Sequence, residues 1–395
     1  MATLHILICC HDHKGMSHTW RALQIASHIA NTFIHSSILI LSDLPIIGRL
    51  KFPQNVDYVH LPGIVLGSNR EYEASSLNID VKSILQIRRK IILSVAKNFK
   101  PDVIIFDSEP HTMPGEITST LAALREKLAQ PKIVWALPDI LGESRAVRLE
   151  WTRGNVYEML ERYCDEIWIF GSKHVFDPVR EYEIPRALVD RLYYTGYLPP
   201  AEIFSKSSLA PTDSGVPLVM VSAGSGGKGY NLVNSYLTFL ERNNGFTPVQ
   251  SFVFAGPMMS SSEKRVLLER AQKLSKVTFR RFSTHFLDYL RSAQLVVSTG
   301  GYNTVCAILS CGKKAIFVPT PEPLNERRVR AKVFHNLGLV DSVAPEDLNA
   351  NHLEEKVRAA LATPAQTSPD SYQDMLGFHG LEKIVERIEV LRSNT

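Results

Sequence analysis

Short apolar runs alternate with amphipathic stretches along most of this 395-residue chain. Leu4 to Cys10 is the first such run, and a segment with helical periodicity follows it from Ser17 to about Ala30. A nearly continuous apolar run is typical of a parallel strand covered by helices on both faces, because neither face meets water. The alternation therefore predicts an α/β protein built on parallel sheets.

The alternation occurs twice. Further strands are expected at 38–42, 56–60, 103–106, 133–136, 166–170 and 191–195, with helices at 81–99, 116–129 and 147–163. After a segment rich in Pro, Ser and Ala, strands are expected at 218–222, 250–255, 277–282, 295–298, 315–318 and 339–343. Helices are expected at 230–242, 346–361 and 380–392. This predicts an N-terminal domain over 1–198, a linker over 199–216, a C-terminal domain over 217–375 and a final helical segment over 376–395.

Composition narrows the class of protein. Apolar residues make up 45% of the chain and charged residues 21%, as in ordinary globular proteins, and a dispersed net charge of +4 gives nucleic-acid binding no support. The five cysteines, Cys9, Cys10, Cys164, Cys306 and Cys311, form no metal-type pair, which favours free thiols in a reducing compartment. The first residues are typical of a strand rather than a signal peptide, and no apolar run has membrane-spanning length. We expect a cytoplasmic protein without a transmembrane segment, and a peripheral membrane contact stays open.

Two glycine-rich turns in the second half each follow a strand and precede a helix. The first is Ala223 to Gly229, and the second contains Gly300 and Gly301. Glycine permits positive φ and close approach of the backbone, and the first amides of a helix lack intrahelical acceptors. An anion such as a phosphate is favoured in such turns. One turn of this kind would be weak support, but two in one domain predict a phosphate-bearing ligand.

These motifs resemble a known family. Ser298-Thr-Gly-Gly-Tyr-Asn-Thr-Val-Cys306, Gly312 to Pro319 and Leu337 to Asp341 look like the donor-domain signature of MurG-like glycosyltransferases, and Ser222 to Gly229 extends the likeness. Within that group the chain resembles predicted bacterial transferases with a glycosyltransferase family 28-type C-terminal domain. The resemblance implies a GT-B fold, two Rossmann-like domains whose parallel sheets face a central cleft. It also implies that the final helical segment packs back on the N-terminal domain.

The resemblance also implies where a nucleotide-sugar donor binds. Its donor contacts map onto Gly224, Ser225, Gly226, Gly227, Lys228, Thr299, Gly300, Gly301, Asn303, Thr304, Glu326 and Arg327. Backbone amides and helix dipoles would hold the diphosphate, so we expect neither a metal ion nor a cofactor. Two departures from the family pattern stand out. Ala307 replaces an acidic residue that grips the ribose, and Arg327 replaces a glutamine that contacts the donor sugar.

His18 is the first catalytic candidate, because a histidine can take a proton from an acceptor hydroxyl near neutral pH. A residue that only caps the helix or positions the acceptor is the alternative. His11, Asp12 and Gly15 match the family loop and are expected to bind the acceptor. The histidines and Asp12 have metal-type donors, but their spacing fits no compact zinc signature.

Asp107 and Glu109 follow a strand, so they lie on the edge of the sheet where ligands bind. Either could act as a base or orient the acceptor, and a carboxylate that caps the next helix is the alternative. Asp139 is a similar acceptor-binding candidate, although Pro138 replaces the family's usual arginine beside it.

The resemblance thus implies transfer of a sugar from a nucleotide-sugar to a small-molecule, lipid-linked or polysaccharide acceptor, with inversion. Two other functions stay open. One is a nucleotide-sugar hydrolase or epimerase of the same fold. The other is a non-catalytic sugar-nucleotide-binding protein, which the Ala307 and Pro138 departures suggest.

Overall fold

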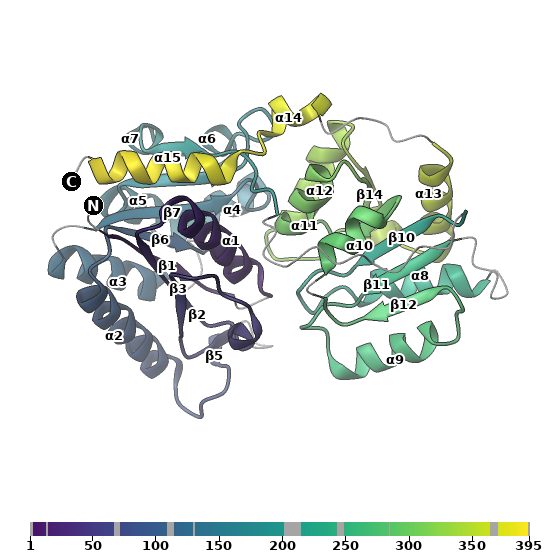
Figure 1. Cartoon of the computed structure of the whole chain (residues 1–395), viewed down its shortest axis with the longest axis horizontal. Coiled ribbons are helices and arrows are strands. Elements are labelled where there is room, and N and C mark those ends of the chain that lie inside the picture. Colours follow the sequence, from purple (N-terminus) through teal and green to yellow (C-terminus); the bar gives the residue numbers. More distant parts are fainter. Residues whose placement is uncertain are drawn as a thin grey trace. The chain divides into compact units, whose positions relative to one another are not determined.

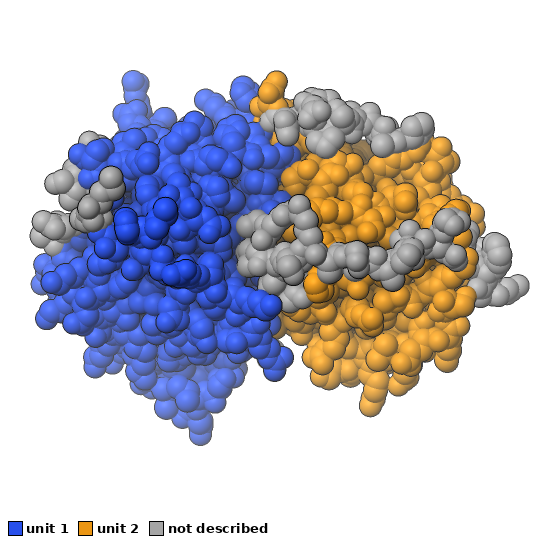
Figure 2. Space-filling model, in the orientation of Figure 1, with its two compact units in different colours: residues 1–203, 377–395 blue, residues 204–376 orange. Residues whose placement is uncertain are grey.

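The computed structural model describes residues 3–12, 15–66, 72–108, 114–128, 131–200, 215–242, 249–283, 285–363 and 370–393. The chain divides into two compact units (Figures 1 and 2). Unit 1 comprises residues 1–203 and 377–395, and unit 2 comprises residues 204–376. Most of the expected linker, 201–214, lies outside the described residues.

Unit 1 contains a seven-stranded sheet in the order β3-β2-β1-β6-β7-β8-β9, with every neighbouring pair parallel. β1 is fully apolar apart from His5 and is buried over almost its whole length, as the sequence predicted. The strands are β1 Leu4–Cys10, β2 Ser36–Ser42, β3 Val56–His60, β6 Val103–Asp107, β7 Lys132–Pro138, β8 Glu166–Phe170 and β9 Leu192–Tyr194.

Helices cover both faces of this sheet. The chain runs outward in one direction from β1 to β3 and in the other from β6 to β9, and right-handed crossovers then place the two sets of helices on opposite faces. Accordingly α1 packs against α15, and α2 packs against α3 (Figure 1). The helices are α1 Ser17–Thr32, α2 Val81–Phe99, α3 Pro114–Lys127, α4 Ser144–Arg153, α5 Val156–Tyr163, α6 Pro178–Glu181, α7 Arg186–Val189 and α15 Gly380–Ser393, with a 3-10 turn, η1, at Ile47–Arg49.

Two local features differ from the sequence expectation. The expectation of a single helix over 147–163 is wrong: α4 ends at Arg153, and after Gly154 the residue Asn155 takes a left-handed conformation with φ of 50° before α5 begins. Asparagine tolerates that conformation better than most residues, so the break is encoded locally. In addition, β4 Ile64–Leu66 and β5 Tyr72–Ala74 form an antiparallel pair that the sequence reading missed.

Unit 2 contains a six-stranded parallel sheet in the order β12-β11-β10-β13-β14-β15. Its strands are β10 Leu218–Ser222, β11 Gln250–Phe254, β12 Val277–Arg280, β13 Leu295–Ser298, β14 Lys314–Phe317 and β15 Asp341–Ser342. Its helices are α8 Tyr230–Arg242, α9 Ser261–Ala271, α10 Phe286–Ser292, α11 Tyr302–Ser310, α12 Glu326–Asn336, α13 Ala350–Ala362 and α14 Asp370–Leu376, with a 3-10 turn, η2, at Pro345–Asp347. The helix expected from 346 begins later, because the side chain of Asn349 caps α13 by accepting from the His352 amide.

The order of strands reverses once in each sheet, between β1 and β6 in unit 1 and between β10 and β13 in unit 2. At such a switch point the loops leave neighbouring strands in opposite directions, and a crevice opens at the carboxyl ends of the strands. Each sheet therefore offers one preferred place for a ligand.

Three further expectations concern the chain as a whole. All five cysteines are free, as predicted. Among the described residues, no helix is both long enough and apolar enough to cross a bilayer. The last helix, α15, packs in unit 1, where Arg387 pairs with the buried carboxylate of Glu166 and stacks on Tyr193 with 3.7 Å between guanidinium carbon and ring centre.

Candidate functional site

The switch point of unit 1 brings His18 and Asp107 together. His18 is the second residue of α1, which follows β1, and Asp107 is the last residue of β6, the neighbour of β1. The His18 Nδ1 lies 2.9 Å from the Asp107 Oδ1. Residues 89 positions apart thus form one hydrogen-bonded pair on the ligand edge of the sheet.

Arg21 completes this cluster, and the sequence reading missed it. Its Nε donates to Asp107 Oδ2 at 2.7 Å and its Nη2 donates to Asp107 Oδ1 at 2.5 Å, a bidentate ion pair. Arg21 lies one helical turn after His18, so an arginine on the buried face of α1 was the available signal. Asp107 is fully buried and Arg21 is 2% exposed, whereas the His18 side chain keeps 15% of its surface exposed. Only the histidine of this cluster is open to a ligand.

The electrostatics favour His18 as a proton acceptor. Burial works against a charged imidazole, but the adjacent Asp107 carboxylate outweighs it and raises the pKa of His18 above its ordinary value of 6.5. Burial likewise opposes ionisation of Asp107, yet Arg21 and then His18 lower the pKa of that carboxyl. The His18 Nδ1 also lies 3.0 Å from the Arg21 Nη2. A proton on Nδ1 would be donated to the Asp107 carboxylate and would leave Nε2 as the basic nitrogen.

Asp12 acts on the start of α1. Its Oδ1 accepts from the His18 amide at 2.9 Å and its Oδ2 accepts from the Thr19 amide at 2.6 Å. The side chain is 6% exposed, so it caps the helix and fixes His18 rather than presenting a free carboxylate to an acceptor. Gly15 is buried in the loop between them. The sequence had assigned both residues to the acceptor site.

His11 belongs to a second ion-pair network behind this loop. Its Nδ1 pairs with the Asp43 carboxylate, which also accepts from Arg88 at 3.1 Å and from the Asp12 amide at 2.8 Å. Burial opposes ionisation of Asp43, but His11 and Arg88 hold the pKa of that carboxyl well below its usual range. Asp43 follows β2 on the same edge of the sheet as Asp107, so the rule that found Asp107 could have found it.

A cavity of about 40 Å³ adjoins this network. Its polar lining includes His11, Arg88, Ser108 and Thr120, and Thr120 Oγ1 has no hydrogen-bond partner among the described residues. The volume suffices for about three water molecules and not for a whole acceptor.

The remaining N-terminal candidates do not join the cluster. Glu109 lies outside the described residues. Asp139 is 1% exposed, and its carboxylate accepts from the Ile140 amide at 2.8 Å and from the Tyr197 hydroxyl at 2.9 Å. Its bonds fasten the loop after β7 to the segment after β9. We therefore regard Asp139 as a residue that stabilises the fold.

The switch point of unit 2 is built around two glycine-rich loops. Gly224 and Gly300, in the loops after β10 and β13, have φ of 77° and 73°, a region that glycine adopts at little cost. A Cβ on Gly224 would lie 3.0 Å from Thr299 Oγ1, and Thr299 is itself fully buried. The two loops therefore approach each other more closely than side chains would allow.

The start of α11 faces this pair of loops. Gly301 is its N-cap and supplies no side-chain cap, so an anion could accept from the first amides of the helix. Asn303 and Thr304, in this first turn, are half-buried. In the first loop Gly224 and Ser225 are half-buried, Gly226 is buried, and Gly227 and Lys228 are exposed. Lys228 Nζ donates to the Pro321 carbonyl at 3.2 Å.

Arg327 lies beside both glycine loops. Its Nη1 donates to Thr320 Oγ1 at 2.9 Å and approaches Thr299 Oγ1 at 3.4 Å, and its Nε pairs with Glu322 at 3.0 Å. Of the donor-site candidates named from the sequence, Thr299, Gly224, Gly301 and Arg327 come together. Thr320 and Glu322 are additional members that the sequence reading missed.

Glu326, another donor-site candidate from the sequence, does not join the group around Arg327. It pairs with the fully buried Arg330 at 2.6 Å, and Arg330 approaches the Gly300 carbonyl at 3.5 Å and lies over the Tyr302 ring. This arrangement fastens α12 to the glycine turn before α11, so Glu326 supports the loop. Ala307 is 3% exposed within α11, so position 307 offers no side-chain acceptor for a ribose.

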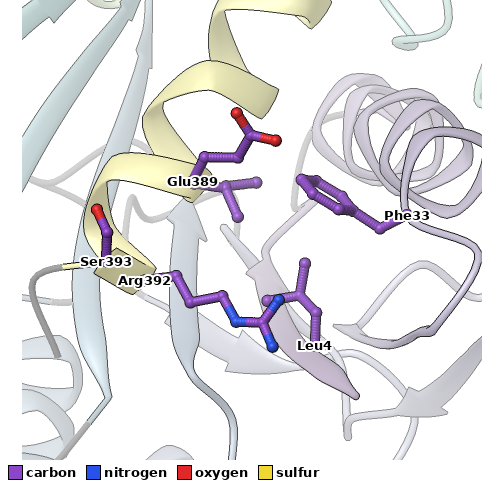
Figure 3. A pocket seen from close by; sticks show the side chains of 6 residues that line it. Leu4, Phe33, Glu389, Arg392 and Ser393 are labelled. Carbon is purple, nitrogen blue, oxygen red and sulfur yellow. The ribbon is translucent and has the colours of Figure 1, made fainter. Parts of the chain in front are cut away.

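Two further features could indicate a site: groups of metal-binding residues and a second, larger cavity. No group of three or more His, Cys, Asp or Glu that could hold a metal occurs in the part of the chain that the structure describes. A cavity of about 370 Å³ lies between Leu4, Phe33 and the end of α15 (Figure 3). Leu4 begins β1, whereas His11 and Asp12 follow its end, so this cavity lies one strand length, about 20 Å, from the candidate site.

Solved structures establish the class of fold. The glycotransferase of kitacinnamycin matches with a TM-score of 0.68 at 13% identity over 99% of this chain and 100% of its own. The calicheamicin glycosyltransferase CalG4 matches with a TM-score of 0.63 at 15% identity over 99% and 98%. MurG of Acinetobacter baumannii matches with a TM-score of 0.57 at 12% identity over 98% and 99%. The chain has the GT-B fold, with two Rossmann-like α/β domains, as the sequence predicted.

Sequence comparison shows which family the second half of the chain resembles. Residues 219–388, a little under half of the chain, match the family model of the glycosyltransferase family 28 C-terminal domain. A UDP-N-acetylglucosamine--N-acetylmuramyl-(pentapeptide) pyrophosphoryl-undecaprenol N-acetylglucosamine transferase of Sulfurihydrogenibium sp. is 30% identical over 116 residues, 29% of this chain. Its counterpart in Geobacter metallireducens is 30% identical over 86 residues, 22% of this chain. The matched segments span 33% and 24% of these relatives, and the MurG-like resemblance is confirmed.

Proposed function

We propose that this protein is a glycosyltransferase that moves a sugar from a nucleotide-sugar donor to an acceptor hydroxyl, with inversion and without a metal ion. The hydrogen bond of 2.9 Å between His18 and Asp107 carries the proposal. It fixes a partly exposed base at the switch point of one Rossmann-like sheet, while the other sheet carries two glycine turns suited to a diphosphate. The family 28 match over the second sheet supports the same reading.

In the proposed reaction His18 Nε2 takes the proton of the acceptor hydroxyl as its oxygen attacks the anomeric carbon of the sugar. The bond between that carbon and the diphosphate oxygen breaks, and its electron pair stays on the diphosphate. Asp107 stabilises the imidazolium that forms, and Arg21 holds Asp107 in place. Attack from the side opposite the leaving group inverts the anomeric centre and requires a single base.

The donor is proposed to bind in unit 2, with its diphosphate at Gly224, Thr299, Gly300 and the first amides of α11. The names of the sequence relatives contain UDP-N-acetylglucosamine and a lipid-linked acceptor, so UDP-sugars are the first donors to test. A lipid-linked acceptor would be met at the cytoplasmic face of a membrane through a peripheral contact. Small-molecule and polysaccharide acceptors remain within the proposal.

The first experiment is binding of a panel of nucleoside diphosphates and nucleotide-sugars, measured by thermal shift and calorimetry. A ligand that binds only the folded state raises its stability, so one nucleotide should stand out. The selected donor is then incubated with candidate acceptors, and free sugar, transferred sugar and epimerised donor are quantified, with EDTA and with Mg²⁺. Transfer that persists in EDTA supports the proposal.

Other results would replace it. Free sugar as the main product in the presence of acceptor would identify a hydrolase, and conversion of the donor sugar would identify an epimerase. Binding without turnover would identify a non-catalytic nucleotide-sugar-binding protein. Loss of turnover in EDTA with recovery in Mg²⁺ would contradict metal independence.

A further inference from the structure

Arg327 occupies an unusual position between the two glycine loops of unit 2. The Nη1 of its guanidinium lies 3.9 Å from where a Cβ of Gly224 would be, and its Nε and Nη2 lie 3.9 and 4.0 Å from where a Cβ of Gly301 would be. The two glycines leave the space beneath this side chain free of side-chain atoms. A cation therefore faces the backbone on which the proposed diphosphate would rest.

The hydrogen bonds of Arg327 leave part of its donor capacity unused. A guanidinium has five N–H donors in a planar fork. Nε is directed to Glu322, and Nη1 is directed to Thr320 and Thr299. Among the described residues Nη2 has no hydrogen-bond partner, although only 17% of the side chain is exposed. The unused N–H groups lie on the side of Gly301.

We propose that Arg327 is the cation that neutralises the diphosphate as it leaves the sugar, and that Glu322 holds this cation until the donor binds. The proposal rests on the proposed function and assigns a catalytic residue within it. When the bond between the anomeric carbon and the diphosphate oxygen breaks, the bonding electron pair adds one negative charge to the diphosphate. A preformed donor of charged hydrogen bonds stabilises that charge more than it stabilises the intact nucleotide-sugar.

Glu322 gives Arg327 a counter-charge while the site holds no donor. Its side chain is also only 17% exposed, so this carboxylate and the guanidinium are largely withdrawn from water together. An isolated buried cation would be unfavourable, and a nearby acid removes that cost. A diphosphate competes with Glu322 for the same fork, because arginine binds phosphate and carboxylate oxygens with the same geometry.

The test compares affinities for UDP and UMP, which share the nucleoside and differ in the second phosphate. Arg327→Gln should lower the affinity for UDP by about 10- to 100-fold, the range expected for charge-assisted hydrogen bonds, and change the affinity for UMP by less than about threefold. Arg327→Lys should lie between wild type and Arg327→Gln. Arg328→Gln is the matched control, since the next residue of α12 is 52% exposed and pairs with Glu346 on the surface.

Two further variants test the arrangement around Arg327. Glu322→Gln should raise the affinity for UDP severalfold, because the competing carboxylate is removed, and a lower affinity would show that Glu322 positions the arginine instead. Gly301→Ala retains a φ of −68° that alanine adopts readily, and its methyl group would occupy the space beside Arg327. It should weaken UDP binding with little change in melting temperature, and unchanged UDP binding would argue against this placement of the diphosphate.

The outcomes separate this inference from the proposed function. If wild type binds no nucleotide, the proposed function fails. If wild type binds UDP and Arg327→Gln keeps the ratio of UDP to UMP affinity, the role of Arg327 fails and the donor site stands. If Arg327→Gln weakens only UDP-glucuronate relative to UDP-glucose, the arginine reads a carboxylate on the sugar and the leaving-group role is overturned.

Discussion

The two switch points of this protein have the same topology and opposite chemistry. In unit 1 the end of β6 and the first turns of α1 carry charged side chains that are fixed by buried ion pairs, with Asp107, His18 and Arg21 at the centre. In unit 2 the loops after β10 and β13 carry glycines with positive φ, and the first amides of α11 have no side-chain cap. The first arrangement suits proton transfer, and the second suits an anion with several oxygens.

The difference agrees with what each proposed role needs. A base must be held in one tautomer and one orientation, so its neighbours are locked by short contacts in the protein interior. A diphosphate needs many donors close together, and only backbone without Cβ atoms provides them at that density. Variants of the unit 1 cluster should therefore lower turnover, whereas variants of the unit 2 glycine loops should lower the affinity for the nucleotide.

The largest expected effect is on turnover. His18→Ala should lower the rate of transfer by about 10²- to 10⁴-fold, because the proposed general base is lost, and leave donor affinity within about twofold. Release of nucleoside diphosphate from the donor measures the first quantity, and calorimetry measures the second. His28→Ala, a half-buried histidine on the same helix, is the control. Unchanged turnover in His18→Ala would remove this residue from the mechanism.

A large effect on stability is expected at the partner of that base. Asp107→Ala should destabilise unit 1 by about 3–5 kcal/mol, because it leaves the buried Arg21 cation without its carboxylate. All four tryptophans, Trp20, Trp135, Trp151 and Trp168, lie in unit 1, so their fluorescence during urea unfolding reports that unit. Glu150→Gln, which breaks an exposed pair with Arg153, should cost no more than about 1 kcal/mol.

In unit 2 we expect a substitution in a glycine loop to weaken UDP binding by more than its effect on stability explains. Gly224→Ala and Gly338→Ala place alanine at similar φ, 77° and 71°, so each should lose about 1–2 kcal/mol of stability. Only the Cβ at position 224 would meet a neighbour, Thr299 Oγ1 at 3.0 Å, whereas nothing lies within 4 Å at position 338. Gly224→Ala should therefore lose most UDP binding and Gly338→Ala should keep it. Equal losses would place the diphosphate elsewhere.

The smallest effect is a displaced pH profile. Because Asp107 raises the pKa of His18 above 6.5, kcat/KM should rise with pH through an apparent pKa above that value. Asp107→Asn removes the carboxylate, while burial and Arg21 still disfavour the charged ring, so the remaining activity should titrate at a lower pH. A profile that Asp107→Asn leaves in place would show that another group titrates.

The same pair predicts how stability depends on pH. The raised pKa of His18 contributes stability that is fully present below the unfolded value and is lost as pH rises through the folded value. The lowered pKa of Asp107 contributes stability that is present above the unfolded value and is lost as pH falls through the folded value. Their joint contribution should thus be greatest at mildly acidic pH, which urea unfolding of unit 1 between pH 4 and pH 8 would measure.

Local patterns predicted the fold well. The limits expected for the strands 4–10, 56–60, 166–170, 218–222 and 295–298 agree with β1, β3, β8, β10 and β13 at both ends. β1, β8, β10 and β13 are buried over almost their whole length, so the apolar run and the strand coincide, whereas the edge strand β3 is only partly buried. The α4–α5 break, the β4–β5 pair, α6, α7 and α14 were missed, because short elements carry too few residues to establish a period. The 11-residue helices α9 and α12 were not predicted either.

The sequence by itself determined the two α/β sheets and the glycine turns, because each depends on neighbours within a few positions. Tertiary structure decided the unit 1 cluster, since residues 12, 18 and 21 lie near one another in the sequence but meet residues 43, 88 and 107 only when β1, β2 and β6 pair. It also decided that Asp12 caps a helix, that Asp139 bonds Tyr197, and that Arg327 reaches both glycine loops. A charged residue acquires its role from its partners in space, and the sequence alone does not show which partners it meets.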